Sequence, residues 1–139
     1  METKGMAKMI KNAFAEAYLA LAREKLIKKI SVSELASYCG LSRSTFYHHF
    51  GEKYELLLWV YTGRFGNTSE EFKDYNRWAL KIADFFSENE SFFIQAYRYT
   101  DFLNWHKQWI YQNICDFIEH EYGKQELTDT MKYQIQSYI

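Results

Sequence analysis

Three features of the sequence predict an all-α fold. Proline is absent and glycine occurs only six times among the 139 residues, so few positions force a helix to end. Runs of β-branched residues, which favour strands, are short. Hydrophobic residues make up 47% of the chain, enough to bury a core, and many of them recur at helical spacing. The length allows one compact domain or two small packed ones.

The first helix is predicted at about residues 5–24. Its apolar residues recur three or four positions apart and form one stripe along a helix, made by Ile10, Phe14, Ala17, Tyr18 and Leu21. The stretch KLIKKI that follows is typical of a short connection.

Two short helices joined by a glycine come next. The S-x-x-E pattern at residues 31–34 is a capping box, in which the serine and the glutamate reciprocally satisfy free backbone amides. It predicts a helix over residues 32–39. Gly40 is a suitable left-handed stop, because glycine has no Cβ to clash there. Ser42 can cap a third helix over about residues 43–50.

The remainder of the chain is rich in aromatic residues and is also predicted to be helical. We expect further helices near residues 52–64, 70–87, 91–99 and 101–122. Thr128 or Asp129 can cap a final helix, which is still amphipathic at Ile139. We therefore expect the chain to stop short of its full length.

The charge of the chain is divided unevenly. Residues 1–55 hold nine Lys and Arg against six Asp and Glu, a balance of +3. The remaining residues hold eight basic and twelve acidic side chains, a balance of −4, and the two parts together give the net charge of −1. A basic first segment favours a polyanion-binding end joined to a solvated body.

Cysteine usage and hydropathy indicate a cytoplasmic protein. Cys39 and Cys115 fall inside predicted helices, and we expect both to be free thiols in a reducing compartment. There is no C-x-x-C pair, so we predict no metal site and no cofactor. No apolar run is long enough to span a bilayer, and the N-terminus lacks the apolar region of a secretory signal.

The pair of short helices has the requirements of a helix-turn-helix unit. Ala36 is small enough for a close crossing, Gly40 allows the turn, and three apolar residues can lock the pair, namely Leu35, Leu41 and Phe46. The second helix would then expose polar side chains to a DNA groove: Arg43, Ser44, Thr45, Tyr47 and His48. The same spacing also fits an ordinary helical hairpin, so spacing alone leaves both interpretations open.

The stretch ISVSELASYCGLSRSTFYHHFGEKYELL resembles the DNA-binding domain of the TetR family of bacterial regulators, and its most distinctive part is STFYHHFGEKYELL. The resemblance covers about residues 6–65. It implies a three-helix, helix-turn-helix DNA-binding domain over residues 1–51, followed by a helical effector and dimerisation domain over residues 52–139. The second domain would be incomplete at its C-terminus. The aromatic remainder more loosely resembles the DhaS-like branch of that family.

The resemblance also implies roles for single residues. Those that would face the major groove are Arg43, Ser44, Thr45 and His48. Tyr47 and His49 would contact phosphate or support the reading helix, and the residues that would touch phosphate at helix N-termini are Ser31, Ser42 and Lys53. Weaker backbone contacts would come from Lys8 and Lys11. Plainer roles are open as well: capping for the two serines, partial packing for Tyr47 and a structural position for His49.

Family members bind palindromic operators as homodimers, so double-stranded DNA and a second copy are the expected partners. Twenty aromatic residues lie in residues 56–139. They could line the pocket of a small-molecule effector, with candidates Trp59, Trp78, Phe85, Tyr97, Trp105 and Trp109, or they could be ordinary core. DhaS-like members instead resemble coactivators that require a ligand-sensing partner protein.

An enzyme is the contrasting class, and we do not predict one. The sequence has no G-x-S-x-G, H-E-x-x-H, P-loop or dinucleotide fingerprint. His106 and His120 are about 21 Å apart along one helix, too far to share a metal. His48 and His49 are adjacent and expected to point to different faces. A third class, an interaction module that has lost DNA binding, is disfavoured by the intact segment from Arg43 to Lys53.

Overall fold

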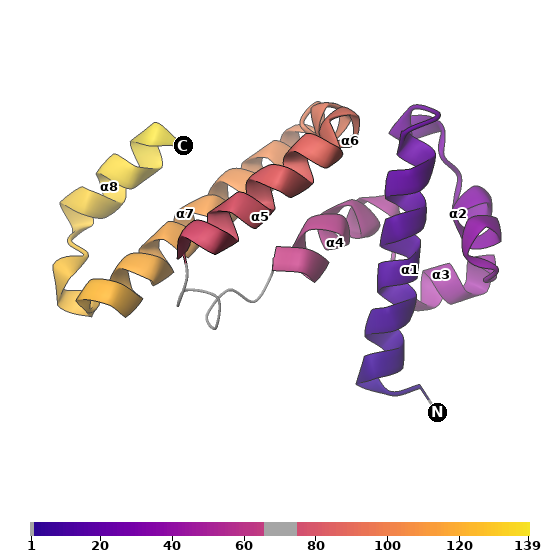
Figure 1. Ribbon diagram of the computed structural model, residues 1–139, viewed down its shortest axis with the longest axis horizontal. Coiled ribbons are helices and arrows are strands. Elements are labelled where there is room, and N and C mark those ends of the chain that lie inside the picture. Colours follow the sequence, from indigo (N-terminus) through magenta and orange to yellow (C-terminus); the bar gives the residue numbers. More distant parts are fainter. Residues whose placement is uncertain (1, 66–74) are drawn as a thin grey trace. The chain divides into compact units, whose positions relative to one another are not determined.

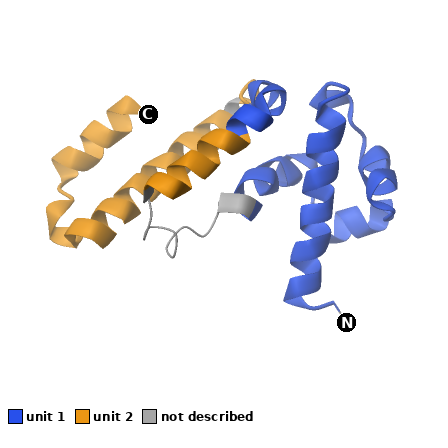
Figure 2. Ribbon diagram, in the orientation of Figure 1, with its two compact units in different colours: residues 1–66, 86–96 blue, residues 67–85, 97–139 orange. Residues whose placement is uncertain are grey.

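The computed structural model describes residues 2–65 and 75–139 of the chain (Figure 1). All regular elements in these residues are helices, which confirms the all-α prediction. The chain divides into two compact units (Figure 2): unit 1 is Met1–Gly66 with Phe86–Ala96, and unit 2 is Asn67–Phe85 with Tyr97–Ile139. No helix among the described residues is long and apolar enough to cross a membrane.

Unit 1 is a helical cluster around one long helix. Its elements are α1 (Lys4–Ala22), the 3₁₀ turn η1 (Ile27–Lys29), α2 (Val32–Cys39), α3 (Arg43–His49), α4 (Lys53–Phe65) and α6 (Glu90–Ala96). The turn η1 lies inside the predicted connection. Helix α1 packs against α2, α3, α4 and α6. The fully buried side chains include Phe14 from α1, Leu35 from α2, Phe46 from α3 and Leu56 from α4, so four helices share one core.

Helix α1 follows the predicted apolar stripe. Thr3 caps it, since its Oγ1 accepts the backbone N–H of Met6 at 3.1 Å. Phe14, Ala17 and Tyr18 are buried as predicted, whereas the two ends of the stripe are only half-buried. The helix ends two residues earlier than predicted.

The two short helices begin where the sequence predicts. Ser31 caps α2 by accepting the backbone N–H of Glu34 at 3.1 Å, and Ser42 caps α3 by accepting that of Thr45 at the same distance. Gly40 ends α2 with φ +69°, and the next N–H, that of Leu41, donates to Ala36 O at 2.8 Å.

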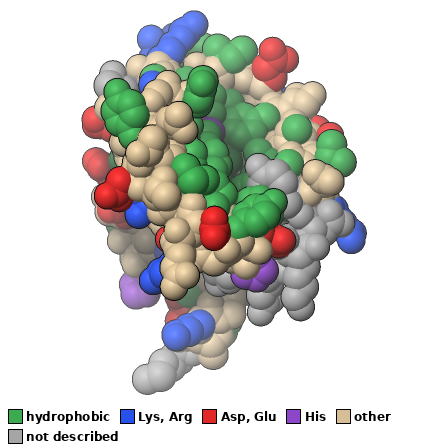
Figure 3. Space-filling model, turned by 90° about the vertical axis from the view of Figure 1, so that its left-hand side faces the viewer, with side chains coloured by type: hydrophobic (Ala, Val, Ile, Leu, Met, Phe, Trp, Pro, Cys, Tyr) green, Lys and Arg blue, Asp and Glu red, His purple; other side chains and the backbone are tan. Residues whose placement is uncertain are grey.

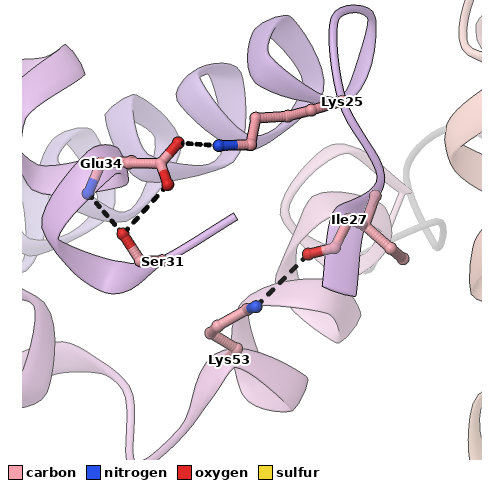
Figure 4. A network of polar contacts seen from close by, with 5 residues as sticks. All are labelled: Lys25, Ile27, Ser31, Glu34 and Lys53. Carbon is pink, nitrogen blue, oxygen red and sulfur yellow. Dashed lines mark hydrogen bonds and ion pairs between the residues drawn. The ribbon is translucent and has the colours of Figure 1, made fainter. Parts of the chain in front are cut away.

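The predicted capping box of Ser31 and Glu34 has a third, distant partner. The Glu34 carboxylate accepts a hydrogen bond from the Ser31 hydroxyl at 3.3 Å and pairs with Lys25 Nζ at 2.6 Å (Figure 4). The Lys25 ammonium, nine residues earlier in the chain, is the main reason that the pKa of Glu34 is lowered, and hydrogen bonds from the backbone and the hydroxyl of Ser31 add to this effect.

Replacing Gly40 by alanine is expected to lower the free energy of unfolding by about 1–2 kcal/mol, because an L-residue is strained at positive φ. A Cβ at this position would meet no atom within 4 Å, so the effect isolates the backbone. Chemical denaturation measures it. The matched control is Gly5→Ala in the first turn of α1, where an added Cβ meets only Thr3 Oγ1 at 3.9 Å. The control should be neutral or slightly stabilising, and an equal loss in both variants would contradict the prediction.

Unit 2 is built from long helices. It contains most of α5 (Tyr75–Glu88), then α7 (Thr100–Tyr122), the 3₁₀ turn η3 (Lys124–Glu126) and α8 (Asp129–Tyr138). Helices α5 and α7 lie side by side, and Trp78 stacks on Trp109 with ring centroids 6.1 Å apart. Thr128 caps α8 through the backbone N–H of Met131. The predicted helix at 91–99 is too long at its C-terminal end, and residues 70–74 of another prediction lie outside the described residues.

Both cysteines are free thiols, as predicted. Cys39 donates its S–H to Ala13 O at 3.3 Å, which ties the end of α2 to α1, and burial raises the pKa of this thiol. Cys115 is buried in α7.

Candidate nucleic-acid interface

Helix α3 has one buried face and one exposed face. Phe46 is fully buried and packs edge-on against Phe14 at 5.2 Å between ring centroids, while Phe50 lies at the same distance from it. On the opposite side, Arg43 and Ser44 are exposed. The helix is therefore held to the core by its aromatic face and presents its polar face to solvent.

The hydroxyl groups at the start of α3 form a small cluster. Ser42 Oγ lies 2.9 Å from Thr45 Oγ1 and 3.3 Å from Ser44 Oγ, in addition to its capping bond. Thr45 is half-buried, whereas Ser42 and Ser44 are exposed. The structure shows the capping role for Ser42 and likewise for Ser31. A phosphate contact by either serine stays a prediction that capping does not prevent, because a hydroxyl oxygen has two lone pairs and one donor.

Tyr47 and the two histidines form the C-terminal part of the helix. Tyr47 is 49% exposed and its ring packs edge-on against Phe46, so it combines partial packing with an accessible surface. His48 is exposed, but the side chain of His49 is only 4% exposed, and its Nε2 lies 3.3 Å from Glu2 Oε1. The rings of His48 and His49 lie 5.0 Å apart. The two imidazole rings are therefore closer together than expected from the prediction that these side chains point to different faces of the helix.

Lys53 lies at the N-terminus of α4 and is engaged inside the unit. Its ammonium donates to the backbone carbonyl of Ile27 at 3.3 Å, close to the Ser31–Glu34–Lys25 contacts (Figure 4). Burial lowers the pKa of Lys53, and the nearby charge of Glu34 partly offsets this effect. A lysine ammonium has three donors, so a phosphate contact would use the other two. No pattern in the sequence indicates the Ile27 partner, since the two residues are 26 positions apart.

Lys11, predicted to contact the DNA backbone, and Trp59, predicted to line a pocket, pack within unit 1. Lys11 Nζ lies 4.6 Å from the centroid of the Trp59 ring and 5.5 Å from that of Phe50, which are cation–π distances. Trp59 Nε1 donates to Asn12 Oδ1 at 3.1 Å. Lys8 is exposed. Trp59 thus joins α4 to α1 and belongs to unit 1.

The other candidate pocket residues belong to unit 2. Trp78 and Phe85 are buried, and Tyr97, Trp105 and Trp109 are half-buried. His106, which was not among the predicted pocket residues, is buried in contact with this group.

His106 is the polar centre of these aromatic side chains. The Tyr97 hydroxyl lies 2.7 Å from His106 Nδ1, and the rings of Tyr97, Trp105 and Trp109 stack on the imidazole at centroid distances of 5.5–6.3 Å. Burial lowers the pKa of His106 to about 4 and raises that of Tyr97 to about 12, so both groups are neutral at pH 7. A clue in the sequence was a histidine at helical spacing within an aromatic stripe.

The order of helices in unit 1, the glycine turn and the exposed face of α3 together define a helix-turn-helix unit. Residues 16–60 match the model of the bacterial regulatory proteins of the tetR family. This segment belongs to the TetR family. The TetR domain therefore spans α2 and α3 completely, with most of α4 and the end of α1. For this segment the family predicted from the motif is confirmed, and the matching family is one of bacterial regulatory proteins.

One curated protein is similar to part of the chain. It is the HTH-type dhaKLM operon transcriptional activator DhaS of Lactococcus lactis subsp. lactis (strain IL1403), 29% identical to the chain over 82 residues. The match covers 57% of this chain and 44% of the relative, so it spans less than half of that protein. No solved structure matches the chain at a significant level.

Proposed function

We propose that this chain is a sequence-specific regulator that inserts α3 into the major groove of double-stranded DNA. One observation supports this most directly: the polar residues of α3 are exposed while Phe46, on the opposite side, is fully buried. Arg43, Ser44, Thr45 and His48 would contact base edges, and Tyr47 would contact phosphate. His49 supports the helix from inside. A regulator of this kind acts on DNA in the cytoplasm.

The chain would bind a palindromic operator as a homodimer. A two-fold dimer places two copies of α3 at half-sites about one helical turn of DNA apart. Helix α8 has no buried residue, and its Tyr133 and Tyr138 are 74% and 90% exposed. Figure 3 shows hydrophobic side chains gathered over one face of the molecule. An exposed apolar surface of this kind is typical of a subunit contact.

Regulation would act through the aromatic side chains around His106. Flat rings with one buried imidazole and one phenol suit a small ligand that has both an apolar ring and a polar group. The second candidate is a coactivator that needs a ligand-sensing partner protein, which the activator named as a relative favours.

A gel-shift assay on DNA from upstream of the chain's own gene tests the proposal. Binding should weaken steeply as salt rises, because displaced counterions supply much of the affinity. Tyr47→Phe should weaken binding to all duplexes alike, by about tenfold, since it removes one hydroxyl contact to phosphate. The matched control is Tyr99→Phe, which changes a 43% exposed tyrosine of unit 2.

The outcomes separate the alternatives. Specific binding by the chain alone, released by a small molecule, supports a ligand-sensing regulator. Specific binding that appears only with a second protein supports the coactivator. Salt-insensitive binding, or equal effects of the two tyrosine substitutions, would show that α3 does not read DNA as proposed.

A further inference from the structure

Three potential metal ligands converge where the N-terminal segment meets the end of α3. Glu2, His48 and His49 each offer one ligand atom, and these atoms all lie within 4.8 Å of one another. The residues come from opposite ends of the DNA-binding unit in sequence, so the fold brings them together. We propose that they form a binding site for a divalent transition-metal ion of the zinc class.

The geometry of the buried ligand supports the proposal. The side chain of His49 is 96% removed from solvent, and its Nε2 has no hydrogen-bond partner among the described residues. A buried polar atom of this kind usually has one, because it has given up its bonds to water. Yet Nε2 lies 3.3 Å from Glu2 Oε1. Ligand atoms around a tetrahedral zinc ion are about 2.0–2.1 Å from the metal, and so about 3.3 Å from one another.

The ligand set has the right chemistry. Imidazole nitrogen and carboxylate oxygen are the donors that zinc and similar borderline ions accept. Glu2 and His48 are exposed, so an ion has a route from solvent and both side chains have room to close the remaining gap. Three protein ligands leave a fourth tetrahedral position for water.

Metal binding would oppose DNA binding, a consequence that rests on the proposed function. His48 is one of the side chains assigned to the major groove, and its imidazole cannot hold the ion and contact a base edge at once. The ion would also fix the N-terminal segment beside the reading helix through Glu2. Zinc would therefore act as a signal that lowers operator affinity.

The site itself can be tested without DNA, on the full untagged chain. Titration with Zn²⁺, and with Co²⁺ as a spectroscopic probe, should show one ion per chain and the visible absorption of tetrahedral cobalt. Glu2→Gln and His48→Ala change exposed side chains, which leaves the fold intact, and each should weaken Zn²⁺ binding by about tenfold or more. His120→Ala is the matched control, because His120 is an exposed histidine 3.5 Å from the carboxylate of Glu121. Absence of binding, or binding that Glu2→Gln and His48→Ala leave unchanged, would overturn the site and leave the approach of Glu2 to His49 as a plain polar contact.

The regulatory consequence has its own readout. In a gel shift, Zn²⁺ should lower the DNA affinity of the unmodified chain but not that of Glu2→Gln, whose reading helix is unaltered. Unchanged affinity at saturating Zn²⁺ would overturn the competition. If no variant binds DNA even without metal, the proposed function fails, and the cobalt spectrum still decides the metal site.

Discussion

Phe46→Ala is expected to lower the free energy of unfolding of unit 1 by about 3–5 kcal/mol. The ring is fully buried and lies within 5.3 Å, centroid to centroid, of the rings of Phe14, Phe50 and Tyr47. Removing it leaves a cavity and also ends three edge-on or tilted aromatic contacts. Urea denaturation followed by circular dichroism measures the loss.

The same substitution should abolish specific DNA binding, because Phe46 is the buried anchor of α3. The control is Tyr38→Ala on α2, which removes an aromatic side chain that is 60% exposed and should change stability by no more than about 0.5 kcal/mol. A loss below about 1 kcal/mol for Phe46→Ala, or a similar loss in both variants, would mean that α3 is not fixed by this contact.

The sequence predicted the helix-turn-helix unit well because its signals are local. Ser31 and Ser42 cap helices that begin one residue later, and Gly40 adopts the predicted left-handed conformation. Each of these features depends on hydrogen bonds or steric contacts within four residues, so it can be predicted from the identities of neighbouring residues. The bounds of α2 were therefore predicted without error.

Contacts between distant residues were not predictable in this way. Lys25 pairs with the carboxylate of Glu34, nine positions away, and Lys53 binds the carbonyl of Ile27, 26 positions away. The approach of Glu2 to His49 likewise depends on where α1 begins relative to α3. No glycine or proline separates α6 from α7, so the end of α6 was predicted too late in the chain.

Arg43 offers the sharpest test of how the DNA would be read. Its side chain is exposed at the first position of α3, and a guanidinium there can bind guanine O6 and N7 together. Arg43→Ala should therefore reduce discrimination at one base pair of each half-site by about 1–3 kcal/mol, roughly 5- to 150-fold in relative affinity. Competition gel shifts against operators with single base-pair changes measure this ratio.

Arg43→Lys separates base reading from simple charge. Lysine keeps the positive charge but lacks the planar fork, so this variant should retain the salt dependence of binding while losing most of the discrimination. Arg23→Ala is the matched control, because Arg23 is an exposed arginine at the C-terminal end of α1, away from the reading helix in sequence. If Arg43→Ala weakens binding to every duplex by the same factor, Arg43 contacts phosphate. Recognition of the base sequence would then depend on Ser44, Thr45 and His48. The capped N-terminus of α3 would lie against the DNA backbone instead of the base edges.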